Sequence, residues 1–482
     1  MTLTIVGLGP GDGRSVTREA WDVVTAADTL YVRTMRHPAV DDLPDDVQVV
    51  SFDQIYELAE DFASVYEQIV QTLLAAAQAS GGDGRIVYAV PGHPLMGEAT
   101  VTALLDAAAT VGLETRIIAG MSFVEPSLIA LGLDGLDGLQ LFDAIDVAAR
   151  DFPPLNTDVP ALLAQVYNRL VAAELKLTLM ALYPDEHEVV LVHGAGTIDQ
   201  ELERVPLYEI DRSQLLAHLT SLFVPPLPSR SSLSGLADTV AHLRGPEGCP
   251  WDQEQSPQSM RAGFLEEVAE VLDALDGGEV EELREELGDL LYHLVMQVVM
   301  AQETESFTLS DVIAGIDVKL RRRHPHVWGD WQVADSDEVV RNWEMLKADE
   351  RDEPRSIVDK IPQALPALAQ AHTLQSAVVK VGFDWPSVAG VEAKVEEELA
   401  ELHGSVTQPE REQEVGDLLF AVVNWARWLN VDAEIALREA NRRFQKRFRR
   451  VELLASAQQQ ALDDMSLADL DALWERAKRE LE

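Results

Sequence analysis

The segment FLEEVAEVLDALDGGEVEELREELGDLLYHL, from Phe264 to Leu294, combines Leu and Val at helical spacing with a high density of acids. Apolar residues at i, i+3, i+4 and i+7 predict two amphipathic helices, and the stretch DALDGGEVEEL predicts the break between them. The apolar positions indicate a helix bundle, whereas neighbouring carboxylates repel each other and require water or a cation. The periodicity continues with almost no strand pattern after about residue 236, so we expect an all-α region.

This helical region repeats itself. Four pairs of motifs follow in one order and at nearly one spacing: EEVAE (266–270) and EELAE (397–401), ELGDLL (286–291) and EVGDLL (414–419), KLRRR (319–323) and RFQKR (443–447), WEMLK (343–347) and WERAK (474–478). Ordered matches at nearly one spacing predict two copies of one helical module.

Each predicted module carries five acids in the same arrangement. On a helix, Glu266, Glu267 and Glu270 fall within an arc of about 100°, and Glu286 and Asp289 share one face of the next helix. An antiparallel pair would bring these five carboxylates to one locus. The second module offers Glu397, Glu398, Glu401, Glu414 and Asp417. A single pattern of this kind is typical of a solvated surface, but its duplication favours a metal site, and clustered oxygen ligands suit Mg²⁺ or Mn²⁺.

Basic and aromatic residues follow the acids in both modules. They are Lys319, Arg323, Trp343 and Lys347 in the first module and Arg443, Arg447, Trp474 and Lys478 in the second. Arginine binds phosphate oxygens in a fork and an indole can stack on a base, so the set predicts a site for a polyphosphate with a base. The alternative for each Trp is a hydrophobic anchor, and HPH (324–326) indicates a structural turn.

Residues 236 to 482 resemble the tandem MazG proteins of the all-α nucleoside triphosphate pyrophosphohydrolase superfamily, through GCPWDQEQ, EExxE…ExxD, RRRHPHVW and VGFDW. The resemblance implies Mg²⁺-dependent hydrolysis of a nucleoside triphosphate to a monophosphate and pyrophosphate, a broad substrate range that can include noncanonical nucleotides, and homodimers. It leaves the catalytic base among four paired glutamates, namely Glu266, Glu267, Glu397 and Glu398. No GxxxxGK[ST] loop is present, which argues against P-loop chemistry.

The two modules differ at one predicted nucleotide contact. Asn441 occupies the position matched by Asp317, and the family's nucleotide contacts resemble Asn441, Arg443, Arg447, Trp474 and Lys478 more closely than the first set. The resemblance therefore implies that the second module is the stronger catalyst and the first is weaker or structural.

Residues 1 to about 215 alternate β runs with helical patterns, which predicts an α/β fold with a mostly parallel sheet. TIVGLGPGD (4–12) lacks the GxGxxG spacing, and alone it is compatible with a simple tight turn. VPGHPLMGEATV (90–101) and AGMSFVEPSLIALGL (119–133) follow, each after a β run. Together these motifs resemble the tetrapyrrole methylase superfamily, and the joined architecture resembles the YabN-type fusion of a methylase-like domain to MazG.

The methylase resemblance implies S-adenosylmethionine as a cofactor, bound between two α/β subdomains. The residues implied at the cleft are Gly9, Pro10, Gly92, His93, Pro94, Leu95, Ser122, Tyr167, Asn168 and, in the loop HGAGT (193–197), Ala195. Two positions depart from the family pattern, because His93 replaces the acid of a Gly-Asp-Pro motif and Phe123 replaces the second residue of a Ser-Ser pair. These changes remove a carboxylate and a hydroxyl from the predicted cleft.

Composition bounds the remaining possibilities. The chain has 482 residues, 47% of them hydrophobic, and a net charge of −45, which disfavours nucleic acid as a partner. No apolar run predicts a membrane span, no leader pattern is found at the N-terminus, and Cys249 is the single cysteine, so we expect a cytoplasmic protein.

The predicted organisation has three domains. The methylase-like domain covers 1–222, a Pro- and Ser-rich linker 223–235, the first module 236–349, a junction with three prolines 350–366, and the second module 367–482. Two other functions stay open at this point: a nucleotide-binding regulatory protein without turnover, or a methyltransferase whose helical half serves assembly.

Overall fold

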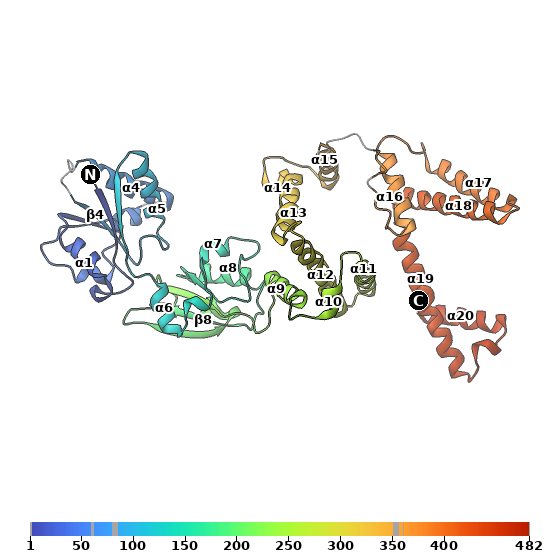
Figure 1. Cartoon of the computed structure of the whole chain (residues 1–482), viewed down its shortest axis with the longest axis horizontal. Coiled ribbons are helices and arrows are strands. Elements are labelled where there is room, and N and C mark those ends of the chain that lie inside the picture. The colour runs from blue at the N-terminus through green and yellow to red at the C-terminus, as the bar shows by residue number, and fades with distance from the viewer. Residues whose placement is uncertain (1, 59–61, 80–84, 350–355, 360, 482) are drawn as a thin grey trace. The chain divides into compact units, whose positions relative to one another are not determined.

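A computed structural model describes residues 2–58, 62–79, 85–349, 356–359 and 361–481 (Figure 1). The chain divides into two compact units, the first ending at Gln255 and the second beginning at Ser256. Of the predicted junction 350–366, positions 350–355 and 360 lie outside the described residues. None of the helices in the described ranges is long and apolar enough to cross a membrane.

The first sheet of unit 1 is entirely parallel, in the order β3-β2-β4-β1-β5. Its strands are β1 (Thr2–Gly7), β2 (Thr29–Val32), β3 (Val49–Ser51), β4 (Ile86–Val90) and β5 (Glu114–Ile118). The connecting helices are α1 (Arg18–Thr25), α2 (Pro38–Asp41), α3 (Asp53–Leu58), α4 (Phe62–Ala79) and α5 (Ala99–Thr110). Apolar side chains of α4 and α5 bury one face of the sheet, and those of α1 and α2 bury the other. This doubly covered sheet confirms the α/β prediction.

The second sheet of unit 1 corrects the prediction of a mostly parallel sheet. Its order is β6-β7-β10-β8-β9, and only β6 and β7 run parallel. The strands are β6 (Gln140–Asp143), β7 (Ala161–Ala164), β8 (Glu188–His193), β9 (Glu201–Pro206) and β10 (Thr220–Val224). The short loop between β8 and β9 permits only antiparallel pairing, because a parallel crossover needs a dozen or more residues.

Three helices accompany this second sheet: α6 (Val124–Leu131), α7 (Ala144–Ala148) and α8 (Arg169–Leu179). The helices α7 and α8 bury one face around Leu163, Leu175 and Leu191. On the other face, Phe123 packs against Leu162, Val190, Val192 and Phe223. The departure at position 123 therefore has a packing role in this chain.

The segment predicted as a linker, 223–235, is bound to unit 1. Its first two residues complete β10, and its end forms the first turn of α9 (Leu233–Arg244). The Asp158 carboxylate accepts hydrogen bonds from the Ser231 amide at 2.7 Å and the Ser232 hydroxyl at 2.5 Å. Unit 1 also includes α10 (Pro250–Glu254), so it contains the first helices of the region that we assigned to the first module.

Unit 2 is helical, as predicted. The segment predicted as the first module continues with α11 (Arg261–Gly277), α12 (Val280–Glu303), α13 (Leu309–Arg323), α14 (Pro325–Trp328) and α15 (Ser336–Asp349). The segment predicted as the second module contains α16 (Ala367–Val379), α17 (Val388–Gly404), α18 (Gln408–Trp428), α19 (Ala433–Ala457) and α20 (Leu467–Leu481). The acidic segments form two helix pairs, α11 with α12 and α17 with α18; the second pair lies side by side at the right of Figure 1.

The break in each acidic segment has a local cause. Gly278 ends α11 with a φ of 77°, in the left-handed region that glycine adopts without a steric penalty. In the second module, Thr407 and Glu410 form a reciprocal capping box that starts α18. Both breaks allow the second helix to fold back along the first.

Candidate metal and nucleotide site

The first helix pair brings three predicted acids together. One carboxylate oxygen each from Glu267 and Glu270 of α11 and Glu286 of α12 lies within 4.8 Å of the others. Burial, together with the charges of Asp289, Glu270 and Glu266, raises the pKa of Glu267. Burial and neighbouring carboxylates, Glu270 and Asp289 foremost, also raise the pKa of Glu286. Asp289 is therefore close enough to act on the cluster electrostatically.

The second helix pair repeats this arrangement. Oxygens of Glu398 and Glu401 of α17 and Glu414 of α18 lie within 4.8 Å of one another. Burial and the charges of Glu401, Asp417 and Glu398 raise the pKa of Glu414. Glu398 is only 5% exposed, so the innermost carboxylate of this cluster is largely removed from water.

The first glutamate of each pair lies outside these clusters of three. Glu266 is exposed on α11, and the side chain of Glu397 pairs with Lys394, whose Nζ lies 2.7 Å from Glu397 Oε1. The same Nζ lies 2.7 Å from Glu398 Oε1. In place of five acids at one locus, each helix pair has three acids with oxygens within 4.8 Å of one another, one aspartate nearby and one peripheral glutamate.

The donor set fits a divalent cation. Three carboxylates at this separation repel each other, which is the cause of the raised pKa values of Glu286 and Glu414 beyond burial. Mg²⁺ prefers oxygen ligands and keeps several waters, so it is usually held by a few carboxylates rather than by a full protein cage. Exposed acids also cluster without a metal; the recurrence of the same three positions in both modules favours a metal.

The basic and aromatic set of the first module also converges. The Arg323 guanidinium of α13 lies 5.8 Å from the centre of the Trp343 ring of α15, and Lys347 Nζ lies 4.9 Å from it. Lys319 is exposed one helical turn before Arg323. Two cations thus lie near one aromatic ring, at distances that favour attraction between them and the ring.

The second module arranges its counterparts differently. Trp474 of α20 packs against the core formed by Val451, Leu454 and Leu473, and its ring lies 5.1 Å from Phe444. These contacts match the hydrophobic anchoring considered as an alternative for each Trp, but Trp474 is only partly buried by them. The polar members of the set lie on α19 and α20: Asn441, Arg443, Arg447 and Lys478. The Nη1 atom of Arg443 lies 3.5 Å from Glu439 Oε2 on the same helix.

The loops predicted to hold S-adenosylmethionine meet at the carboxyl ends of β1, β4 and β5. Gly9 and Gly92 pair through their backbones, with the Gly9 amide 3.1 Å from Gly92 O and the Gly92 amide 2.8 Å from Gly9 O. A Cβ on Gly7 would lie 2.5 Å from Gly92 O and 2.6 Å from the Gly120 amide nitrogen. The glycines therefore permit backbone-to-backbone contact between these loops.

Several predicted cleft residues have structural partners. Ser122 Oγ donates to Glu125 at 2.5 Å, Asn168 caps α8 by accepting from the Val171 amide at 2.9 Å, and the Leu95 amide donates to His93 Nδ1 at 3.1 Å. The Tyr167 ring stacks on that of His218, with the ring centroids 6.1 Å apart. Pro94 is buried and Leu95 is exposed. In the HGAGT loop, a Cβ on Gly196 would lie 3.4 Å from Pro10 Cγ, and Ala195 packs against the same apolar cluster as Phe123. Ser122, His93 and Asn168 thus hold local turns and a helix cap.

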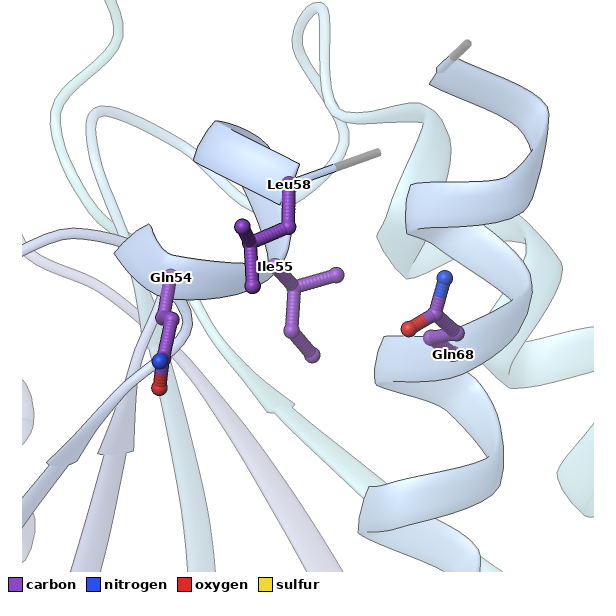
Figure 2. A pocket seen from close by; sticks show the side chains of 4 residues that line it. All are labelled: Gln54, Ile55, Leu58 and Gln68. Atoms are coloured by element: carbon purple, nitrogen blue, oxygen red, sulfur yellow. The ribbon is translucent and has the colours of Figure 1, made fainter. Parts of the chain in front are cut away.

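A separate surface depression lies between α3 and α4. It has a volume of about 320 Å³ and is lined by Gln54, Ile55, Leu58 and Gln68, whose side chains are drawn in Figure 2. None of the residues predicted from the sequence lines it, and these four lining residues carry no charge.

The family model of the MazG nucleotide pyrophosphohydrolase domain matches residues 255–328. Over 258 residues, or 52% of this chain, the sequence is 42% identical to the nucleoside triphosphate pyrophosphohydrolase of Escherichia coli, of which 98% is covered. The chain belongs to the MazG family. The Thermotoga maritima nucleoside triphosphate pyrophosphohydrolase/pyrophosphatase MazG is 41% identical over 244 residues, covering 50% of this chain and 94% of that protein.

The rest of this MazG chain carries a second family match. The model of the Tetrapyrrole (Corrin/Porphyrin) Methylases matches residues 2–211. The uncharacterized protein YabN of Bacillus subtilis is 39% identical over 486 residues, covering 99% of this chain and 98% of YabN. Both halves, and their fusion in one chain, are as the sequence motifs predicted.

Two residues of the acidic sites were missed in the sequence analysis. Lys394 precedes Glu398 by four residues, and this helical spacing could have indicated an ion pair. His293 Nε2 lies 3.6 Å from Glu267 Oε1, but these residues belong to different helices, so no spacing along the chain relates them.

Proposed function

We propose that the chain is a Mg²⁺-dependent nucleoside triphosphate pyrophosphohydrolase that releases a monophosphate and pyrophosphate, with noncanonical nucleotides among its substrates. The observation that carries this proposal is the pair of three-carboxylate clusters, one in each helical module of a MazG protein. Mn²⁺ is an alternative cation for the same oxygen ligands.

The metal would be held by Glu267, Glu270 and Glu286 in the first module, with Asp289 beside them. The second module would use Glu398, Glu401, Glu414 and Asp417. A bound Mg²⁺ would supply Lewis acidity toward the phosphate oxygens and lower the pKa of a coordinated water. The helix pairs hold the carboxylates in place before the substrate arrives, which avoids the free-energy cost of assembling them during the reaction.

The proposed reaction is attack of water at the α-phosphorus. The water oxygen forms a bond to phosphorus while the bond to the oxygen bridging the α- and β-phosphates breaks, so that pyrophosphate leaves. A glutamate accepts the proton from the water. We propose that this base is one of the paired glutamates: Glu266, Glu267, Glu397 or Glu398.

Basic side chains would neutralise the leaving group. In the first module, Arg323 and Lys347 already lie together at Trp343, and Lys319 lies one turn away. In the second module, this role falls to Arg443, Arg447 and Lys478, with Asn441 and Trp474 nearer the nucleoside. Guanidinium groups bind phosphate oxygens in pairs, and their charge stabilises the developing negative charge on pyrophosphate.

We also propose that the protein acts as a homodimer. Three apolar side chains at i, i+4 and i+7 on α12 are exposed, and their counterparts on α18 are exposed too. We call these six the apolar stripe: Leu287, Leu291, Leu294, Val415, Leu419 and Val422. A helix face of this kind is normally covered by another helix, and a second copy of the same face is a self-complementary partner.

Pyrophosphate release from a panel of canonical and damaged nucleoside triphosphates tests the proposed activity. We expect release of pyrophosphate with Mg²⁺ and none with EDTA. Nucleotide binding without turnover would instead support a regulatory protein, and release of inorganic phosphate would contradict the cleavage position.

For unit 1 we propose binding of S-adenosylmethionine at the loops after β1, β4 and β5. The methylase family match over residues 2–211 supports this proposal. Titration calorimetry with S-adenosylmethionine tests it, and absence of heat at millimolar cofactor would leave unit 1 as an interaction domain.

A further inference from the structure

Each acidic cluster contains one carboxylate that faces a basic side chain. In the first module the base is His293, whose Nε2 lies 3.6 Å from Glu267 Oε1. In the second module the base is Lys394, whose Nζ lies 2.7 Å from Glu398 Oε1. Glu267 and Glu398 are equivalent positions, because each is the second residue of its motif when EEVAE is aligned with EELAE.

The two bases are not equivalent positions. His293 belongs to α12 and Lys394 to α17, the first helix of its pair. Extending the alignment of EEVAE with EELAE toward the N-terminus matches Lys394 with Gly263, and extending that of ELGDLL with EVGDLL toward the C-terminus matches His293 with Ala421. Wherever one module has the base, the other has a residue with almost no side chain.

The packing around His293 favours glycine at position 263. A Cβ on Gly263 would lie 3.0 Å from His293 Cε1 and 3.4 Å from its Nε2, so the imidazole lies against the bare backbone of α11. The rings of Phe264 and Tyr292 pack edge to face with the imidazole, with centroid distances of 6.1 Å and 5.5 Å. These contacts leave His293 only 6% exposed and fix the orientation of its ring.

The ring nitrogens of His293 have unequal surroundings. Within the described residues, Nδ1 is buried without a hydrogen-bond partner, whereas Nε2 faces Glu267. In the second module the aligned residue is Ala421, which is 7% exposed and has no basic group. There Lys394 reaches the glutamate along its own helix.

We infer that His293 is the positioning residue of the first cluster: its imidazole, with Nε2 3.6 Å from Glu267 Oε1, holds the Glu267 carboxylate in the orientation that binds the cation, as Lys394 holds Glu398 in the second. This inference rests on the proposed metal site. Groups that orient a metal ligand typically affect metal affinity by about 10- to 100-fold when they are removed.

Mn²⁺ binding to the full-length protein without nucleotide, followed by the electron paramagnetic resonance of free Mn²⁺, tests the inference. The parent carries Glu401→Gln and Glu414→Gln, which remove the second cluster. In it, we expect His293→Ala to raise the Mn²⁺ dissociation constant by about 10- to 100-fold. His293→Gln keeps a donor near the Nε2 position and should stay within about threefold of the parent.

The decisive variant moves the base to the other helix. His293→Ala combined with Gly263→Lys reproduces the second module's arrangement and should restore Mn²⁺ affinity to within about threefold of the parent. Thermal melting of each variant separates a local effect from unfolding. Unchanged affinity in His293→Ala, or equal loss in His293→Gln and His293→Ala with native melting, overturns the inference. Unchanged affinity in Glu267→Gln would instead overturn the proposed metal site itself.

Discussion

Replacement of Leu419 by Ala is expected to weaken the proposed homodimer without affecting the fold of the single chain. Leu419 lies in the middle of the α18 part of the apolar stripe and is 52% exposed. Fully burying a leucine side chain is worth about 1.5–3 kcal/mol, so covering the exposed half contributes about 1 kcal/mol.

Twofold symmetry doubles this contribution. Each dimer buries two copies of Leu419, so the substitution should cost about 2 kcal/mol of association free energy. A difference of this size corresponds to roughly a 30-fold higher dissociation constant. Sedimentation equilibrium over a range of protein concentrations measures this constant directly, and circular dichroism checks that helix content is retained.

Leu170 on α8 of unit 1 provides a matched control. It is 66% exposed and lies outside the apolar stripe, so Leu170→Ala should leave the dissociation constant within about threefold. The assignment of the apolar stripe to the dimer would be refuted if Leu419→Ala raised the dissociation constant less than threefold. Equal increases in the dissociation constant for both variants would refute it too.

Three further predictions concern the sites. Pyrophosphate release should fall more in Glu398→Gln than in Glu267→Gln, and equal losses would contradict the stronger role of the second module. The raised pKa values of Glu286 and Glu414 mean that these two carboxyls bind protons more tightly in the folded than in the unfolded state. As pH falls from 7 toward 5, the metal-free protein should therefore gain thermal stability relative to a Glu286→Gln, Glu414→Gln variant. Saturating Mg²⁺ should remove this gain; an unchanged melting profile with Mg²⁺ would argue against a cation at the clusters. Gly7→Ala should destabilise unit 1 by about 1–3 kcal/mol because its Cβ would overlap Gly92 O, as measured by urea denaturation.

Much of unit 2 could be predicted because its signals are local. The 3.6-residue period identified α11, α12, α17 and α18, and the short breaks required each pair to fold back. Glu267, Glu270 and Glu286 converge for that reason. The MazG and methylase motifs likewise identified both halves of the chain.

What the sequence did not reveal depends on contacts between distant residues. The pairing of β10 with β7 and β8 joins runs that other elements separate along the chain, and no period indicates its direction. His293 and Glu267 meet only because two helices pack, and Trp474 could be assigned to a core only once Val451 and Leu473 were placed beside it. The serines after β10 suggested a linker, whereas Asp158 binds them to unit 1.

The position of β10 has a consequence for how this chain is made and divided. β10 is the last strand of unit 1 in the sequence but the middle strand of its sheet. During synthesis, the edges of β7 and β8 that pair with β10 stay without hydrogen-bond partners until Val224 has left the ribosome. A fragment cut where the methylase match ends, at residue 211, would lack the central strand and expose two unpaired edges that invite aggregation. Separate expression of the methylase half should therefore extend to Gln255.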